Sequence, residues 1–269
     1  MVVVREVLCK SALSKSRIYG VDYSVNPYLG CQHGCVYCYA RFMTKYHSHR
    51  ERWGEFVDVK INLPQILSRE LPRAERGIVL LSSVTDPYQP VEEKYELTRK
   101  TLQRLLAYNF PVSVLTKSAL VARDADLLSK FPECEVGLTI TTLDEGVREG
   151  FEPHASGIRE RLDALKTLSS HGVKTYAFLG PLLPFLIEDT LDDLAAGLED
   201  AGVSRVLVDR LNIKYGNWDT VKELLVRKYP QLLHKYEAVL FNRSSYFEDL
   251  KEKIAKVLQS RGLSFSFCY

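Results

Sequence analysis

The sequence carries little net charge, and this argues against one class of function at the outset. Thirty-six Lys and Arg residues are balanced by thirty-four Asp and Glu residues, which leaves a formal charge of +2. A histone-like or polybasic nucleic-acid binder depends on a large cationic excess that neutralises phosphates. The balance argues against that class, although it does not exclude a local basic patch.

Long apolar runs are also missing. No uninterrupted apolar stretch approaches the roughly 18 residues that suggest a membrane-spanning helix. The N-terminal segment carries Arg5 and Lys10 and lacks the apolar core of a secretory signal. Gly/Ser linkers and low-complexity segments are absent as well. These absences predict a soluble, cytoplasmic protein that makes no membrane contact.

The six cysteines do not form the pattern of a secreted disulfide framework. Cys31, Cys35 and Cys38 fall within eight residues, whereas the other three, Cys9, Cys134 and Cys268, are scattered. A close cluster in a chain of this length indicates metal or redox chemistry in a reducing compartment. Cys134 and Cys268 are interpreted as structural thiols. An alternative hypothesis for Cys268 is that it donates hydrogen at the opening of a barrel-shaped fold.

Short apolar runs alternate with amphipathic segments along the chain. The runs predict buried strands over 77–86, 111–118, 135–142, 174–184 and 204–213, after a weaker strand over 21–30. The intervening segments predict helices over 97–108, 123–131, 158–172 and 189–202. Continuous apolar strands rich in β-branched residues are typical of a parallel sheet covered on both faces. The residues from 216 onward are predicted to be mostly helical, with a terminal strand over 263–269.

Six strand–helix units in succession predict an α/β fold with right-handed crossovers and parallel strands. Periodicity alone leaves open whether they form a partial barrel or a doubly wound sheet. In either case the chemistry is expected at the carboxyl ends of the strands. Residues at these ends are Ser83, Thr85, Asp86, Lys117, Thr139, Thr141, Gly180 and Asn212.

The segment GCQHGCVYCYAR directly follows the first predicted strand and holds Cys31, Cys35 and Cys38 in the spacing C-x3-C-x2-C. Three thiolates are one short of a closed structural zinc site or a fully protein-ligated iron–sulfur cluster. Two interpretations follow. A 4Fe–4S cluster would keep one iron open to an external ligand. Alternatively, His47 or His49 would complete a zinc site in a non-enzymatic binding module.

The flanking residues favour the first interpretation. NPYLGCQHGCVYCYAR resembles the opening motif of the spore photoproduct lyase-like branch of the radical S-adenosylmethionine (SAM) superfamily, whose signature is C-x3-C-x-aromatic-C, with Tyr37 at the aromatic position. The resemblance implies a 4Fe–4S cluster on the three cysteines, SAM on the open iron, and an external electron donor of flavodoxin or ferredoxin type. It also implies a partial (β/α)6 TIM-type barrel over residues 1–215, with a helical C-terminal extension over 216–269 in the same globular unit.

Further segments extend the resemblance to the SAM site. SSVTDPYQPVE (82–92) places Thr85, with Asp86 beside it, at the amino group of SAM. LTKS (115–118) and LTIT (138–141) place Lys117 and Thr139 at the carboxylate of SAM, and Thr141 near the ribose. A carboxylate needs a cation and hydroxyl donors, and adenine needs an aromatic contact such as Tyr37. FEPHASGIRERLDAL (151–165) also resembles the family, but no catalytic role transfers from it, and Glu152 is open to interpretation as an ordinary loop acid.

One position departs from the family pattern. Spore photoproduct lyases have a hydrogen-donating cysteine where this chain has Ser83, and the aliphatic hydroxyl of a serine is a poor hydrogen-atom donor. Tyr39 matches a family tyrosine thought to relay hydrogen. We therefore expect a radical SAM enzyme that does not repair spore photoproduct by that route. Its substrate is unidentified, and a nucleic-acid base or lesion is suggested by family analogy. The basic and aromatic residues of the C-terminal third are interpreted as a solvated helical face.

Overall fold

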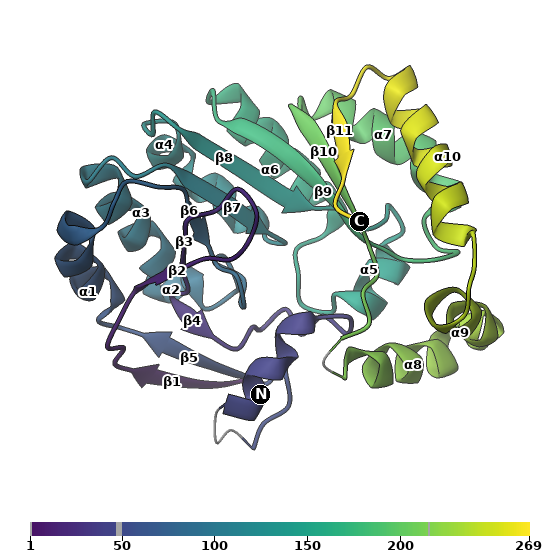
Figure 1. Ribbon diagram of the computed structural model, residues 1–269, viewed down its shortest axis with the longest axis horizontal. Coiled ribbons are helices and arrows are strands. Elements are labelled where there is room, and N and C mark those ends of the chain that lie inside the picture. Colours follow the sequence, from purple (N-terminus) through teal and green to yellow (C-terminus); the bar gives the residue numbers. More distant parts are fainter. Residues whose placement is uncertain (1, 47–49, 215) are drawn as a thin grey trace.

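The computed structural model of the protein describes residues 2–46, 50–214 and 216–269 (Figure 1). His47 and His49, the two candidates for a fourth zinc ligand, lie outside the described residues. Within the described residues, no helix is both long enough and apolar enough to cross a membrane.

One eight-stranded sheet forms the frame of the molecule. Its strand order is β11-β10-β9-β8-β7-β6-β3-β2. The strands are β2 (Leu13–Lys15), β3 (Tyr23–Val25), β6 (Val79–Leu81), β7 (Val112–Thr116), β8 (Cys134–Thr139), β9 (Lys174–Leu182), β10 (Arg205–Arg210) and β11 (Phe265–Phe267). Every neighbouring pair from β3 to β11 is parallel, and only the edge strand β2 pairs antiparallel within this sheet. The prediction of an α/β fold with a parallel sheet is confirmed.

A second, three-stranded sheet was not predicted. It contains β1 (Val3–Val7), β5 (Phe56–Lys60) and β4 (Tyr28–Leu29) in the order β1-β5-β4. The predicted strand over 21–30 is therefore wrong as one element, because its two halves pair in different sheets. Pro27 lies at the break and has no N–H to donate to a ladder.

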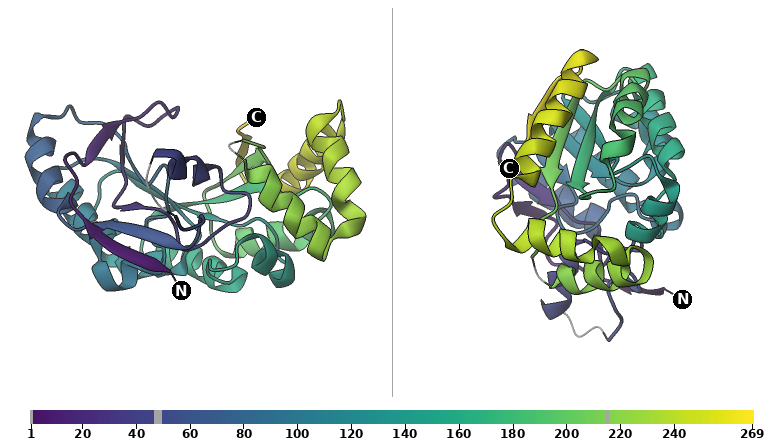
Figure 2. Two further views of the ribbon diagram at one scale, coloured as in Figure 1. Left: turned by 90° about the horizontal axis from the view of Figure 1, so that it is seen from below. Right: turned by 90° about the vertical axis from the view of Figure 1, so that its right-hand side faces the viewer.

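Most helices cover the outer face of the large sheet (Figure 1). The helices are α1 (Leu63–Glu70), α2 (Glu92–Tyr95), α3 (Leu97–Ala107), α4 (Ala125–Leu128), α5 (Glu145–Phe151), α6 (Ile158–Ser170), α7 (Leu191–Asp200), α8 (Asn217–Lys228), α9 (Leu233–Phe241) and α10 (Tyr246–Ser260). Two of them, α8 and α9, lie instead beside the cysteine-containing segment (Figure 1). Short 3₁₀ helices span Tyr39–Tyr46, Leu71–Arg73, Ala119–Asp124, Glu188–Thr190 and Pro230–Leu232. The sheet curves into a partial barrel that is open on one side, with most helices behind it (Figures 1 and 2).

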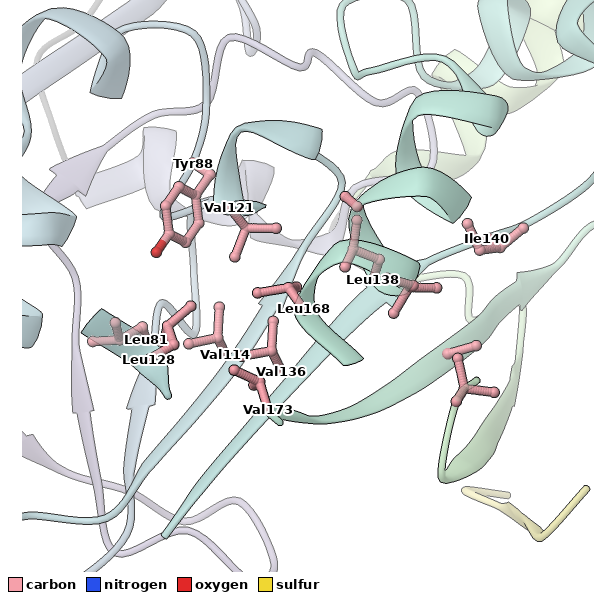
Figure 3. Packing of buried hydrophobic residues seen from close by; sticks show 14 of the residues in the cluster. Leu81, Tyr88, Val114, Val121, Leu128, Val136, Leu138, Ile140, Leu168 and Val173 are labelled. Atoms are coloured by element: carbon pink, nitrogen blue, oxygen red, sulfur yellow. The ribbon is translucent and has the colours of Figure 1, made fainter. Parts of the chain in front are cut away.

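The core lies between the sheet and these helices. Strand side chains such as Val114, Val136 and Leu138 pack against Val121 and Leu168 of the helical layer (Figure 3). On β7 the burial alternates, because Val114 and Thr116 face the helices while Ser113 and Leu115 face the inside of the barrel. The expectation that both faces of every strand are covered is therefore wrong for this sheet, whose inner face lines a cavity.

The C-terminal helices contribute to the same core. Leu250, Ile254 and Leu258 of α10 belong to the hydrophobic cluster that also contains Val206 and Val208 of β10. Strand β11 extends the sheet beyond β10, as the predicted terminal strand requires. The division into 1–215 and 216–269 stays a prediction.

Candidate active site in the open barrel

The three clustered cysteines lie in one loop that follows β4. Gly30 begins this loop at φ +82°, and a Cβ there would lie 2.3 Å from the backbone oxygen of Phe56. Gly34, at φ +61°, passes Gly54, at φ +100°, so closely that a Cβ on Gly54 would lie 2.9 Å from the Cα of Gly34. Only glycine fits such close approaches in this backbone region. The loop is therefore shaped by backbone contacts before any ligand is considered.

The thiols face a cavity of ≈1720 Å³ on the inner side of the barrel. Cys31 and Cys35 are buried, Cys38 is partly buried, and all three line this cavity. Burial, together with the charge of Cys31, raises the pKa of the Cys38 thiol to about 11. Among the described residues, no three His, Cys, Asp or Glu side chains converge on a single ion. A 4Fe–4S cluster does not require such convergence, because each thiolate binds a different iron atom.

Asp86 is buried and bonded on both carboxylate oxygens. Its Oδ1 accepts hydrogen bonds from the Thr116 hydroxyl at 2.6 Å and the Tyr88 N–H at 2.9 Å. Its Oδ2 accepts from the backbone N–H of Lys117 at 2.9 Å and lies 3.4 Å from Nδ1 of His33. Burial would raise the pKa of Asp86, but His33 and Thr116 outweigh it and hold this pKa well below its usual range. Asp86 therefore joins the cysteine loop to the end of β7.

Thr85 also contacts the cysteine loop. Its hydroxyl donates to the Gly30 carbonyl at 2.5 Å and accepts from the amide of Gln89 at 3.0 Å. The same amide donates to the Gly30 carbonyl at 3.2 Å, and its oxygen accepts from the N–H of Gln32 at 2.9 Å. Gln89 is fully buried. Sequence reasoning missed this residue, and its only local signal is an amide side chain between Tyr88 and Pro90.

Lys117 and Thr139 come together on the cavity wall. The ammonium Nζ of Lys117 lies 3.5 Å from the Thr139 hydroxyl and 5.8 Å from the centroid of the Tyr37 ring. Burial alone would lower the pKa of Lys117, but the charges of Cys35 and Glu152 outweigh it, and the pKa is raised. The structure thus places a charged ammonium and a hydroxyl beside the thiols.

Thr141 lies elsewhere. It is buried and is not among the described residues that line the cavity, and its hydroxyl donates to Glu152 at 3.5 Å.

Glu152 is the centre of a buried polar cluster behind the cysteine loop. The Tyr37 hydroxyl donates to its Oε1, and Oε2 lies 2.5 Å from Nη2 of Arg161. Arg161 also donates to the Thr139 carbonyl at 2.9 Å. Glu152 is 0% exposed and Arg161 is 1% exposed, so the pair is fully desolvated. The interpretation of Glu152 as an ordinary loop acid is therefore wrong.

Tyr39 and Ser83 are neighbours on the cavity wall. The Tyr39 hydroxyl donates to the backbone carbonyl of Ser83 at 2.5 Å. The Ser83 hydroxyl accepts from the Asn26 amide at 3.2 Å, and the Asn26 oxygen accepts from the Ser83 N–H at 3.0 Å. Tyr39 is half exposed, whereas Ser83 is partly buried. The structure therefore brings these two predicted residues together at the end of β6.

Helix α8 supports the cysteine loop from the C-terminal region. The buried Asn217 amide donates to the Tyr37 carbonyl at 2.9 Å, and the Thr220 hydroxyl donates to the Val36 carbonyl at 2.6 Å. Phe151 stacks on Tyr37, with ring centroids 6.5 Å apart. The two hydrogen bonds join residues 180 and 184 positions apart, and no local pattern in the sequence indicated them.

Relatives with similar sequences were found in several organisms. An uncharacterized protein of Methanocaldococcus jannaschii is 41% identical over 183 residues, which are 68% of this chain and 69% of the relative. An uncharacterized protein of Mycobacterium tuberculosis is 31% identical, covering 94% of this chain and 79% of its own length. A radical SAM Nα-GlyT isomerase of Pseudomonas phage M6 is 21% identical, covering 90% of this chain and 52% of its own length.

Solved structures share the fold. Spore photoproduct lyase complexed with dinucleoside spore photoproduct superposes with a TM-score of 0.74 at 15% identity, covering 99% of this chain and 82% of the lyase. SuiB of Streptococcus suis bound to SAM superposes with a TM-score of 0.60 at 13% identity, covering 91% of this chain and 49% of SuiB.

The sequence model of the radical SAM superfamily matches residues 25–198, which include the cysteine loop and the strands from β4 to β9. Members of this family are enzymes that use a 4Fe–4S cluster together with SAM. The chain belongs to the radical SAM superfamily.

Proposed function

We propose that this radical SAM enzyme takes a hydrogen atom from a nucleic-acid substrate, at a base or a base lesion. The fold it shares with a lyase that binds a dinucleoside photoproduct supports this substrate class. The relative from a phage is named as a GlyT isomerase, so the name of a similar chain indicates a reaction other than that of a lyase. The reaction is therefore defined here by its hydrogen-abstraction step and its substrate class.

Cys31, Cys35 and Cys38 are proposed to hold the cluster. The single observation that carries this assignment is that all three thiols line one cavity, beside the ammonium of Lys117. The donor set fits the group, because three thiolates leave one iron open and a nearby cation offsets their charge. When bound, the cluster and SAM together supply the 5′-deoxyadenosyl radical that abstracts hydrogen.

The carboxylate of SAM is proposed to bind Lys117 and Thr139, whose polar atoms already lie 3.5 Å apart on the cavity wall. Thr85 is proposed to accept from the amino group, since one lone pair of its hydroxyl is left after its bonds to Gly30 and Gln89. The Tyr37 ring is proposed to face the adenine moiety.

Asp86 and Thr141 are proposed to act through other residues. Asp86 orients Lys117 through the backbone N–H bond at 2.9 Å. Thr141 donates to Glu152, which holds the Tyr37 hydroxyl. We propose this indirect role for Thr141 in place of the expected contact with the ribose.

Tyr39 and Ser83 are proposed to lie where the substrate reacts. The Tyr39 hydroxyl carries a transferable hydrogen at the cavity wall, and its bond to the Ser83 carbonyl fixes its position. Ser83 occupies the position of the donor cysteine in spore photoproduct lyases, so Tyr39 is the better candidate for returning hydrogen. As a radical SAM enzyme, the protein needs an external electron donor, which we propose to be a flavodoxin or a ferredoxin.

Anaerobic reconstitution followed by isotope transfer tests this proposal. We expect about four irons per chain, as three-thiolate ligation of a 4Fe–4S cluster implies. Oligonucleotides deuterated in their bases or sugars should pass deuterium into 5′-deoxyadenosine. The same oligonucleotides without deuterium provide the control. Deuterium transfer from peptides with none from any nucleic acid would refute the substrate class. A colourless protein that keeps one zinc would contradict the cluster assignment itself.

A further inference from the structure

The hairpin between β2 and β3 carries an exposed tip at the mouth of the cavity. We propose that this tip, residues 15–21, contacts an unpaired stretch of nucleic acid, with Tyr19 stacked on a base and with Lys15 and Arg17 on phosphates. This inference rests on the proposed nucleic-acid substrate. It names a surface that binds this substrate away from the cysteine loop and the residues proposed to bind SAM.

Two neighbouring apolar side chains at the tip are open to solvent. Tyr19 is 103% exposed and Ile18 is 47% exposed, and both line the mouth of the cavity. Most apolar side chains of this size in the chain are buried. A tyrosine ring with both faces accessible can stack on any base, because every base has a π-face. The tip therefore presents a base-stacking group at the amino ends of the parallel strands, on the same cavity whose other end holds the cysteines.

The hairpin backbone is held in a defined shape. Ser16 N–H donates to the Asp22 carbonyl at 2.8 Å, and Val21 N–H donates to the Ile18 carbonyl at 3.1 Å. The Asp22 carboxylate accepts from the Ile78 N–H at 2.7 Å, which fixes the tip to the start of β6. A ring on such a turn loses little freedom when it binds a ligand, and this favours affinity.

The base of the hairpin is fixed as well. The Glu70 carboxylate of α1 accepts from the backbone N–H groups of Ala12 and Leu13 at 3.0 and 2.7 Å. This contact anchors β2 on the helical layer, so that the tip projects from a rigid edge of the sheet.

Cations outnumber anions around the tip, where Asp22 is an acidic side chain whose carboxylate accepts from the Ile78 N–H. Residues 8–21 contain Lys10, Lys15 and Arg17 and no acidic residue. All three cations are exposed, and none forms an ion pair with another described residue. Such a segment complements phosphates, although the chain as a whole is nearly neutral. The near-neutral overall charge left room for a local basic patch, and we assign one to this segment.

The hairpin also lies on one border of the opening of the barrel. β2 and β11 are the two edge strands of the eight-stranded sheet. Figure 2 shows the hairpin tip and the C-terminal end on the same, open side of the molecule. Beside β11, the Arg210 guanidinium lies 5.5 Å from the centroid of the Tyr269 ring, and both residues line the cavity. A strand that crosses the opening would therefore meet cations and aromatic rings on both borders.

Fluorescence anisotropy with labelled single-stranded oligonucleotides tests the inference. We expect Tyr19→Ala to weaken binding by about tenfold, the loss of one base–aromatic stack, and Tyr19→Phe to bind like the wild type. Lys15→Gln with Arg17→Gln should lower the slope of log Kd against log salt by about one per lost phosphate contact. Tyr108→Ala, an exposed tyrosine away from the cavity, is the matched control. Thermal unfolding checks that each variant is folded.

The outcomes separate this inference from the proposed function. Wild-type binding and deuterium transfer from oligonucleotides, with unchanged binding in Tyr19→Ala, would overturn the hairpin assignment alone. Absence of binding and transfer in the wild type would overturn the proposed function and the hairpin assignment with it. A Tyr19→Ala variant that binds oligonucleotides normally but is reduced more slowly by a flavodoxin would make the hairpin a protein-docking surface, which contradicts the inference.

Discussion

The Tyr37 hydroxyl, between the second and third cysteines of the loop, donates a hydrogen bond to Glu152, which lies 115 residues further along the chain. Arg161 holds the other oxygen of the same carboxylate at 2.5 Å, where both side chains are desolvated. The aromatic position of the cysteine motif is therefore fixed by a buried ion pair on a distant segment. This relationship links cofactor placement to the stability of the barrel.

Replacing Glu152 by Ala should strongly destabilise the apo-protein. The substitution leaves the Arg161 guanidinium buried without its counter-charge, which typically costs about 3–5 kcal/mol. Denaturant unfolding of the cluster-free chain measures this directly. Glu149→Ala is the matched control, because Glu149 is 64% exposed and its partner Arg148 keeps a second ion pair with Glu145. Equal stability of the two variants would contradict the role given to the ion pair.

The same carboxylate makes the free energy of unfolding depend on pH in the acidic range. Burial would raise the pKa of Glu152, but Arg161 and Lys117 outweigh it, and the pKa is lowered. A depressed folded pKa gives stability that is present above the unfolded value of about 4.3 and is lost as pH falls through the folded value. We expect the free energy of unfolding to fall less steeply below that pH in Glu152→Gln than in the wild type. Identical acid profiles would argue against this assignment.

Gly30→Ala should impair the cysteine loop. A Cβ would lie 2.3 Å from the Phe56 carbonyl oxygen in addition to the cost of φ +82°. Gly172→Ala isolates the second effect, since it has φ +78° and nothing within 4 Å of its Cβ. The control should lose only about 1–2 kcal/mol, the cost of the left-handed conformation. We expect Gly30→Ala to lose more stability and most of its iron after reconstitution. Equal losses in both variants would show that the close approach is unimportant.

Removing the Asn217 amide should loosen the link between α8 and the cysteine loop. Asn217→Ala leaves the Tyr37 carbonyl without this donor in a buried site, which costs about 1–3 kcal/mol. Reduced thermal stability and lower iron retention under a chelator are the expected results. Asn242→Ala, at an exposed position after α9, provides the comparison. If both variants retain iron equally well, α8 does not support the loop in this way.

Lys117→Gln should weaken SAM binding while the cluster is retained. A hydrogen bond to a charged group is worth about 1.5–3 kcal/mol, which corresponds to roughly 10–150-fold in affinity. Equilibrium binding to the reconstituted protein gives the dissociation constant. Lys174→Gln is the control, since Lys174 lines the same cavity but pairs with Glu135 at 3.3 Å. Unchanged affinity in Lys117→Gln would remove this residue from the SAM site.

The succession of strands, and the edge of the sheet that carries the site, could be predicted because both depend on the local pattern of apolar and polar residues. Apolar runs marked β6 to β10, and polar residues stand at the carboxyl ends of β6, β7 and β8. Thr85, Lys117 and Thr139 therefore reach one cavity, as the carboxyl ends of parallel strands require. The cysteine spacing identified the family for the same reason, since all three ligands lie within eight residues.

The supporting contacts could not be predicted because they join distant segments. Gln89, Glu152 and Asn217 each reach the cysteine loop from more than 50 residues away. Their side chains look like ordinary loop or helix residues until the fold buries them. The small sheet was missed for a related reason, because β4 has only two residues and its partner β5 comes much later in the chain.

Formation of 5′-deoxyadenosine by the anaerobically reconstituted protein tests the central claim most directly. Under a strong reductant, the wild type should contain about four irons per chain, as ligation by three thiolates implies, and should cleave SAM. Cys35→Ala should lose both the iron and the nucleoside product, whereas Cys134→Ala, outside the motif, should keep both. A Cys35→Ala variant that still forms 5′-deoxyadenosine at the wild-type rate, or a wild type that binds four irons and forms none, would contradict the account.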